Sequence, residues 1–377
     1  MPDKRISFFT SPIGLGHATR DVAIVVHLGA DVSFTTGGGA ARLLAGAGES
    51  VRDEYSPPRF EVDGSGKLRN PARWLWRYYR YYKDCKRIAS RVIARENPDV
   101  VVSDEDFASI AVAQEMGIRT ILITDILQTS FTAGWPGTAI EGRMNRAMRE
   151  MMRRCDAVIM PEAGRSTRNV FRVGPITRSP SRTREEIRRA CGFEKKTVLV
   201  SVGGTDAGAF LIDRVLDAMA AIDRGRAGGG TETVIVSGPS IEVAAAGRKG
   251  VRGRNARVMG YVDNLHEMIL AADVLVSLAG RSTIDEAEAA GTPSVFIPIA
   301  GHFEQEANAA RLGFSASDID RLAEMIGAKL DEPRRPDADG ANAATGDGGG
   351  SGIGGHHDSG RAGAKAAARL IASVAAR

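Results

Sequence analysis

At 377 residues the chain exceeds the size of a single ordinary hydrophobic core, so we expect two domains. Its 43% of hydrophobic and 25% of charged residues are typical of a globular protein, and no run of about 18 apolar residues predicts a transmembrane helix. The net charge of +4 suits ligands that carry phosphate or an anionic membrane surface without requiring either of them.

Short apolar runs alternate with helical patterns through the first half of the chain. Runs rich in β-branched residues predict buried strands at 5–9, 31–36, 99–104, 119–125 and 156–162. Apolar residues at helical spacing predict helices at 17–28, 40–48, 72–95, 107–116 and 141–154. This alternation favours an α/β fold in which helices cover both faces of a parallel, Rossmann-like sheet.

The pattern breaks near residues 168–186, where prolines and arginines predict a linker. A second set of strands is then predicted at 197–204, 233–238, 256–262, 273–280 and 294–299. Residues 331–360 have a composition that cannot bury an apolar core, which predicts disorder. The domains expected are therefore 1–170 and 183–330, with a linker at 171–182 and a closing helix at 361–377 that packs back on the body.

The stretch SPIGLGHATR at 11–20 joins the first strand to the first helix. Gly14 and Gly16 let the backbone approach an anion or a substrate at the positive end of a helix, and His17 lies at that position. Thr19 stands where the dinucleotide-binding fingerprint has its third glycine, which argues against NAD. The alternative is a tight turn in which His17 is an ordinary first-turn residue.

Two further loops follow apolar strands in the second half of the chain. In SVGGTDAGAF at 201–210, backbone amides and one hydroxyl could hold a phosphate group. In the second loop, Glu286 follows the expected start of a helix by one turn and could accept the two hydroxyls of a ribose. A polar run after the last strand suits sugar hydroxyls, although a solvated helix face with caps is the alternative. The candidate donor-side residues are Gly203, Gly204, Thr205, Gly280, Ser282, Thr283, Glu286, His302, Gln305 and Asn308.

The order of these motifs resembles that of family 28 glycosyltransferases, which have the GT-B fold of two Rossmann-like domains facing across a cleft. A GxGH turn is followed by GGT, by SLAGRSTIDE, by AAGTP and by HFEQEAN, and the resemblance is dense over residues 197–312. It implies that Thr205 and the Ser282–Thr283 turn hold the diphosphate of a nucleotide-sugar. It also implies that Glu286 binds the ribose, that Val262 reads uracil through its main chain, and that Gln305 contacts the donor sugar. Glu306 replaces the second glutamine of the MurG pattern, which leaves the sugar open.

These observations predict an inverting, metal-independent transferase that moves a hexose or N-acetylhexosamine from a UDP-sugar to a hydroxyl acceptor. UDP-sugar is expected as substrate, with no cofactor and no nucleic acid as a partner. An imidazole can activate the acceptor hydroxyl, so His17 is the expected general base. The acceptor-side loop is expected to include Gly14, Gly16, Arg20 and Asp104. The alternatives are a UDP-N-acetylglucosamine 2-epimerase and a non-catalytic nucleotide-sugar-binding subunit of a membrane complex.

Asp104-Glu105-Asp106 forms a DxD after a strand, a pattern that holds manganese in transferases of another fold. Because it ends a strand of the N-terminal half, we expect cleft-lining acids, with Asp104 as an acceptor contact or an orienting partner of His17.

Residues 74–87 combine a core stripe with exposed aromatic and basic side chains. This predicts contact with an anionic membrane, for which an amphipathic helix without a membrane role is the alternative. A lipid-linked acceptor would fit that contact. Three widely spaced cysteines and the lack of a signal-peptide pattern favour the cytoplasm, at the inner face of the cell membrane.

Overall fold

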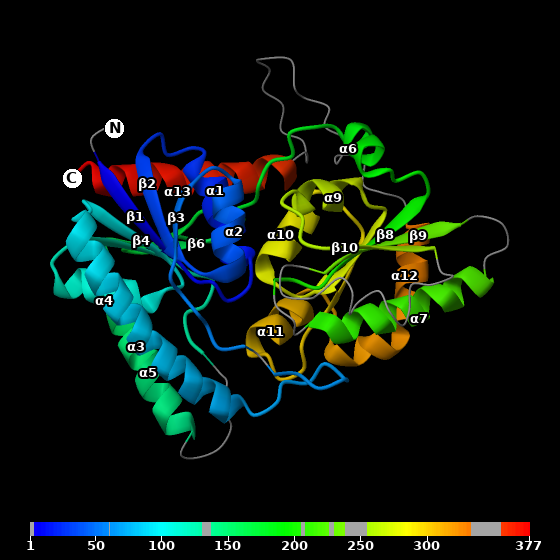
Figure 1. Ribbon diagram of the computed structural model, residues 1–377, viewed down its shortest axis with the longest axis horizontal. Coiled ribbons are helices and arrows are strands. Elements are labelled where there is room, and N and C mark those ends of the chain that lie inside the picture. The colour runs from blue at the N-terminus through cyan, green and yellow to red at the C-terminus, as the bar shows by residue number, and fades with distance from the viewer. Residues whose placement is uncertain are drawn as a thin grey trace.

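Two parallel β-sheets organise the chain (Figure 1). The computed structural model describes residues 4–59, 61–129, 137–204, 208–225, 230–237, 255–332 and 356–377. The first sheet has the strand order β3-β2-β1-β4-β5-β6-β7. Its strands are β1 (Arg5–Thr10), β2 (Asp31–Thr36), β3 (Ser50–Asp53), β4 (Val100–Asp104), β5 (Arg119–Ile123), β6 (Ala157–Met160) and β7 (Val170–Arg172).

Helices cover both faces of this sheet, so its central strands are buried and read as continuous apolar runs. Alternate strand residues divide between the two faces: Phe8 packs with α1, α2 and the C-terminal helix, whereas Phe9 packs with α3 and α4. The helices are α1 (Gly16–Val25), α2 (Gly38–Gly46), α3 (Pro71–Glu96), α4 (Phe107–Glu115), α5 (Gly137–Arg154) and α13 (His356–Ala375).

The second sheet has five strands in the order β10-β9-β8-β11-β12. Its strands are β8 (Lys196–Ser201), β9 (Thr231–Val236), β10 (Ala256–Met259), β11 (Val274–Leu278) and β12 (Ser294–Ile297). The associated helices are α6 (Arg184–Cys191), α7 (Ala209–Gly225), α9 (Leu265–Ala271), α10 (Arg281–Ala289), α11 (Phe303–Arg311) and α12 (Leu322–Asp331), with a 3₁₀ helix η2 (Ala316–Arg321).

The C-terminal helix α13 returns to the N-terminal half. Ala367, Ile371 and Val374 are buried in the same core cluster as Phe8 and Phe34. Figure 1 shows α13 lying along the first sheet although it follows the second sheet in the sequence.

Three sequence predictions need correction. Strands β3 and β7 were not predicted, and β7 lies at the start of the segment interpreted as linker. Helix α12 ends at Asp331 and α13 begins at His356, so both enter the segment predicted to be disordered. The remainder of that segment, 333–355, lies outside the described residues.

The strand order reverses at β1–β4 in the first sheet and at β8–β11 in the second. Ligands of open α/β sheets bind at such switch points, outside the carboxyl ends of the strands. The two switch points face each other, because the Ser282 Oγ at the start of α10 donates to the Gly16 carbonyl oxygen at 3.0 Å. A second link lies at residues 66–68, where Leu68 N donates to the Ala300 oxygen at 2.8 Å.

Candidate functional site

A cavity of about 480 Å³ lies between the two switch points. Both halves of the chain contribute to its wall, and most of the residues expected from the sequence line it. Asp104 lies behind the wall with no exposed surface, Asn308 is not part of the lining, and Thr205 lies outside the described residues. The expected residues on the wall are Gly14, Gly16, His17, Arg20, Gly203, Gly204, Val262, Gly280, Ser282, Thr283, Glu286, His302 and Gln305.

The glycines of the two loops allow the halves of the chain to meet. Gly14 has φ +86°, a left-handed conformation that residues with a Cβ rarely adopt. A Cβ on Gly16 would lie 2.8 Å from Ser282 Oγ, and a Cβ on Gly204 would lie 3.0 Å from the Leu15 backbone nitrogen. Close approach across the cavity therefore favours glycine at Gly16 and Gly204, whereas positive φ angles favour it at Gly14 and Gly203.

His17 and Arg20, one turn apart on α1, share Asp104 at the end of β4. The Nδ1 of His17 lies 2.8 Å from Asp104 Oδ1, which leaves Nε2 as the ring nitrogen that can meet a substrate. Arg20 donates from Nε to Oδ2 at 2.7 Å and from Nη2 to Oδ1 at 2.5 Å. Asp104 therefore holds the Nδ1 side of the His17 ring, and it has no exposed surface in this structure.

The same contacts set the charges in this cluster. Burial alone lowers the pKa of His17, but the charge and hydrogen bond of Asp104 and the charge of Glu105 outweigh it and raise the pKa to about 9. Burial alone raises the pKa of Asp104, and the cations of Arg20 and His17 outweigh that effect and lower it. In the free protein at pH 7, Asp104 is thus a carboxylate and His17 is mostly imidazolium.

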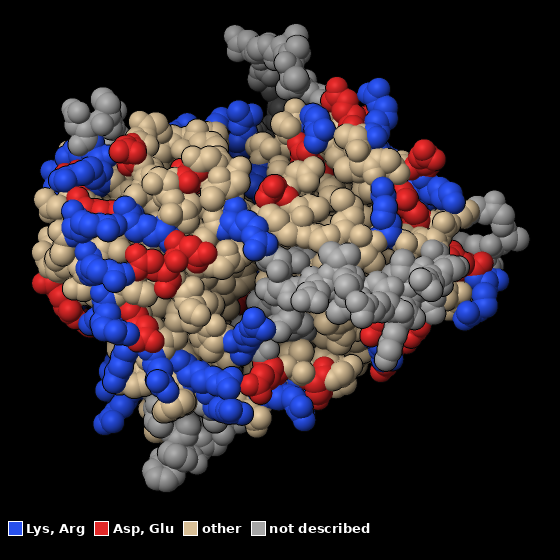
Figure 2. All heavy atoms as spheres, in the orientation of Figure 1, with Lys and Arg blue, Asp and Glu red and all other residues tan. Residues whose placement is uncertain are grey.

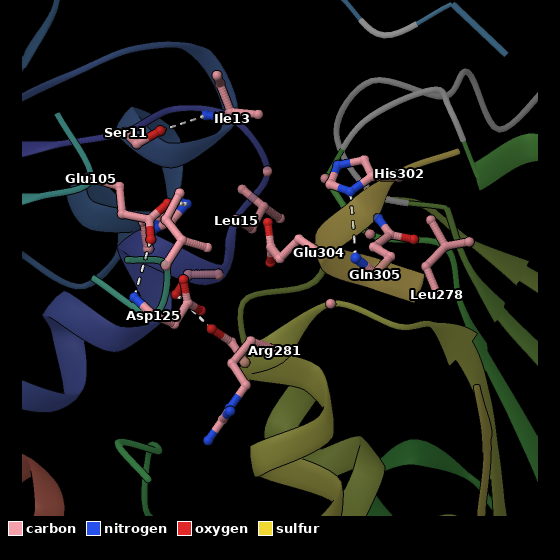
Figure 3. A pocket seen from close by; sticks show the side chains of 18 of the residues that line it. Ser11, Ile13, Leu15, Glu105, Asp125, Leu278, Arg281, His302, Glu304 and Gln305 are labelled. Carbon is pink, nitrogen blue, oxygen red and sulfur yellow. Dashed lines mark hydrogen bonds and ion pairs between the residues drawn. The ribbon is translucent and has the colours of Figure 1, made fainter. Parts of the chain in front are cut away.

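Three more carboxyl groups, those of Glu105, Asp125 and Glu304, line the cavity (Figure 3), and each interacts electrostatically with His17. Glu105, at φ +55°, places Oε2 3.7 Å from His17 Nε2, and its Oε1 accepts from the backbone nitrogen of Asp125 at 3.2 Å. Asp125 Oδ2 lies 3.7 Å from Arg20 Nη1. Glu304 of α11 approaches from the other side of the cavity.

The pKa values of these carboxyl groups diverge. Burial and then the charge of Asp125 raise the pKa of Glu105 and bring that of Glu304 to about 7. Burial also acts to raise the pKa of Asp125, but the charge of Arg20 and a hydrogen bond with Glu105 lower it to about 2. Sequence analysis placed Glu105 among the cleft-lining acids and Glu304 in the polar run suited to sugar hydroxyls, and it assigned no role to Asp125. Asp125 follows an apolar strand, as Asp104 ends one, and that position was the available signal.

The opposite wall is formed by the start of α10. Gly280 precedes its first helical residue, so the unpaired amides and the positive dipole end of the helix face the cavity. Glu286, expected to bind ribose, is ion-paired in the free protein. The Arg178 Nε donates to Glu286 Oε1 at 3.0 Å, and Arg178 Nη1 donates to the backbone carbonyl oxygen of Asp263 at 2.7 Å. Arg178 was not predicted, because it comes from the segment interpreted as linker.

Several side chains of the polar run that begins α11 make hydrogen bonds within the protein. Gln305 Oε1 accepts from Ile299 N at 3.1 Å, and Asn308 Nδ2 donates to the Ala279 oxygen at 3.2 Å. Burial lowers the pKa of His302 to about 4, so this ring is neutral at physiological pH. Glu306, the residue that departs from the MurG pattern, accepts from Gly301 N at 2.8 Å and fixes the turn before the helix.

The two aspartate side chains of the DxD pattern do not lie at one common site. Asp104 contacts His17 and Arg20, whereas Asp106 caps α4 and accepts from Tyr55 Oη at 2.7 Å. Among the residues that the structure describes, no group of three or more His, Cys, Asp or Glu side chains is arranged to hold a metal ion.

Beyond His17 the cavity becomes apolar. This part of the wall comes from α3, from the start of α4 and from α5. Its side chains include Trp74, Leu75, Tyr78, Tyr82, Phe107, Met144, Met148 and Met151.

Comparison with known proteins gives a consistent classification. A model described as the glycosyltransferase family 28 C-terminal domain matches residues 197–331. An uncharacterized glycosyltransferase of Methanopyrus kandleri is 30% identical over 238 residues, which span 59% of this chain and 63% of that protein. Another, from Methanosarcina acetivorans, is 24% identical over 327 residues, or 81% of this chain and 82% of the relative.

Solved structures share the fold at low sequence identity. The glycosyltransferase of kitacinnamycin superposes with a TM-score of 0.63 and 16% identity, covering 99% of both chains. MurG of Acinetobacter baumannii gives a TM-score of 0.51 and 16% identity, covering 98% of both chains. With the two facing parallel sheets, these likenesses show that the chain has the GT-B fold and is a glycosyltransferase whose residues 197–331 match the family 28 C-terminal domain.

Proposed function

We propose that this glycosyltransferase moves a hexose or an N-acetylhexosamine from a UDP-sugar to an acceptor hydroxyl, with inversion at the anomeric carbon. One observation carries the proposal: His17, held by Asp104, and the start of α10 line the same cavity from opposite sides. A base and an anion-stabilising helix end are the two groups that this displacement needs.

In the proposed step the acceptor oxygen attacks the anomeric carbon while its proton passes to His17 Nε2. The bond between the anomeric carbon and the diphosphate oxygen breaks, and UDP leaves with the electron pair. A single displacement of this kind inverts the anomeric centre. The amides at the start of α10 would stabilise the departing diphosphate without a metal ion. His17 must be neutral to accept the proton, so the reaction should be favoured by alkaline pH.

Binding and turnover test this proposal separately. In a thermal-shift panel of UDP-, GDP- and dTDP-sugars, we expect the UDP-sugars to raise the Tm most. The shift is measurable, because a ligand at ten times its Kd adds about 1.4 kcal/mol of stability. The variant His17→Gln should lose about 10²–10⁴-fold in release of UDP from the preferred donor and retain its UDP affinity. His27→Gln, on the same chain but outside the cavity lining, is the matched control.

Three outcomes would overturn the proposal. One is undiminished turnover in His17→Gln. Another is conversion of UDP-N-acetylglucosamine alone into its 2-epimer, detected by chromatography of the donor. The third is UDP binding with neither transfer nor hydrolysis, which a non-catalytic subunit would give.

We also propose a lipid-linked acceptor and contact with the inner face of an anionic membrane. Trp76 is 59% and Tyr79 is 53% exposed on α3, and the cations of Arg80 and Lys83 lie over their rings at 5.2 and 4.6 Å. Lysine and arginine side chains gather over the lower part of the N-terminal half, where α3 and α5 lie (Figure 2). No described helix is both long and apolar enough to cross a bilayer.

Vesicle flotation tests the membrane contact. The protein should float with vesicles rich in phosphatidylglycerol at low salt and remain behind with pure phosphatidylcholine vesicles. Replacing both exposed rings, as Trp76→Ser and Tyr79→Ser, should weaken the interaction. Absence of flotation at low salt, or flotation that ignores lipid charge, would contradict this part of the proposal.

A further inference from the structure

Arg20 is the most completely buried cation at the site, and sequence analysis placed it in the acceptor-side loop without giving it a chemical role. Its exposure is 3%, and its guanidinium forms a two-pronged contact with both oxygens of Asp104. Its Nη2 also lies 3.2 Å from His17 Nδ1. Arg20 and His17 thus compete for one carboxylate that has no exposed surface.

Charge balance decides what this competition does. A buried carboxylate requires a compensating cation, because an unpaired charge at low dielectric is strongly destabilised. With Asp104 and His17 alone, the imidazole would have to supply that cation and would keep its proton to a higher pH than it does beside Arg20. With Arg20 present, Asp104 is already matched, and a second positive charge on His17 faces the guanidinium. Arg20 thereby acts against the effect of Asp104 on His17.

We propose that Arg20 is a positioning residue that takes up the charge of Asp104, so that His17 keeps its orientation without being held permanently as an imidazolium. This inference rests on the proposed function only in making His17 the base. The other ionisable groups around His17 stay in place in the experiment below. They are Asp21 on α1, Glu105 after β4, Asp125 after β5, Arg281 on α10 and Glu304 on α11.

The direct test needs no substrate. Histidine Cε1 signals are followed by NMR against pH in the full-length protein, and the His17 signal is assigned by its loss in His17→Gln. In Arg20→Gln the titration midpoint of His17 should rise by about one pH unit or more, because a nearby positive charge is removed. Arg20→Lys keeps the charge but cannot make the bidentate contact with Asp104. In this variant the titration midpoint of His17 should stay within about half a pH unit of the wild-type value. An unchanged or lower midpoint in Arg20→Gln overturns the proposal.

A second pair of variants covers the case in which Arg20→Gln alone does not fold. Asp104→Asn/Arg20→Gln lacks both buried charges, and its His17 midpoint is compared with that of Asp104→Asn. The double variant should titrate at higher pH than the single one, and equal midpoints would overturn the proposal.

Activity gives a readout that a purely structural role would not move. For Arg20→Gln the rise of kcat/KM with pH should shift upward together with the NMR midpoint, so that the loss is at least about tenfold near pH 7.5 and shrinks in alkali. An equal loss at every pH would show that Arg20 acts only in folding. If the His17 midpoint rises in Arg20→Gln while the wild-type protein transfers no sugar, the proposed function is wrong. The inference that Arg20 lowers the pKa of His17 is then still supported.

Discussion

Glu304 allows the electrostatics of the closed cavity to be measured as stability. It reaches the cavity from α11, and burial followed by the negative charge of Asp125 raises its pKa from 4.5 to about 7. Asp125 belongs to the other half of the chain, so the repulsion acts across the cavity (Figure 3). We predict that Glu304→Gln, which keeps the size and removes the charge, stabilises the protein at alkaline pH.

The sign follows from proton binding. A carboxyl group whose pKa is raised by folding binds its proton more tightly in the folded state, so stability falls as pH rises from 4.5 to about 7. The shift corresponds to about 3 kcal/mol, and partial exposure of Glu304 reduces this to about 1–3 kcal/mol. The gain from Glu304→Gln should therefore be complete above pH 7 and absent near pH 4.5.

Unfolding measured by calorimetry at pH 4.5 and pH 8.5 checks this prediction. Glu304→Gln should raise the Tm by a few degrees at pH 8.5 and leave it unchanged at pH 4.5. Glu288→Gln, an exposed position on α10, controls for a general effect of removing a negative charge. Equal effects at the two pH values, or destabilisation at pH 8.5, would refute the reasoning about Asp125.

Three other variants or conditions probe the site. Gly204→Ala should lower turnover about 5- to 150-fold, because the new Cβ meets the Leu15 backbone at 3.0 Å; Gly280→Ala, with no atom within 4 Å of its new Cβ, should cost less, and equal turnover would remove the steric explanation. For Glu286→Gln, calorimetry should show about 10-fold or more weaker binding of UDP and a smaller loss for 2′-deoxy-UDP, which keeps one of the two hydroxyls, whereas equal losses would exclude a contact with the 2′-hydroxyl. Between pH 7 and about 9, kcat/KM of the wild type should rise about tenfold per pH unit as His17 loses its proton, and a fall over this range would exclude it as the base.

The strand pattern could be predicted from the sequence because both sheets are parallel and covered on two faces. The two missed strands lack that property. β3 (Ser50–Asp53) is a half-buried edge strand, and β7 (Val170–Arg172) has three residues and no fully buried side chain. Neither presents the continuous apolar run on which the other strands were recognised.

The candidate site could be predicted only where a loop has a recognisable local sequence pattern. Glycines after a strand mark a close approach, and they placed His17 and Gly204 in the right region. Contacts between distant segments have no such signal. Arg178 and Glu286 are 108 residues apart, and nothing in either sequence neighbourhood indicates that they form an ion pair. The same holds for Glu304 and Asp125, which approach each other only because the two halves face one another.

Two arginines hold the two carboxylates expected at the site, and their different surroundings imply different roles. Asp104 has no exposed surface and is fixed by the fork of Arg20, so it can influence a substrate only through His17. Glu286 lies on the cavity wall, and Arg178 binds it through one hydrogen bond. A ribose at Glu286 would have to exchange for that bond, so the net gain on binding must be smaller than the new contact alone would give. We therefore expect the Arg20 pair to persist through the proposed reaction and the Arg178 pair to rearrange when a ribose binds at Glu286.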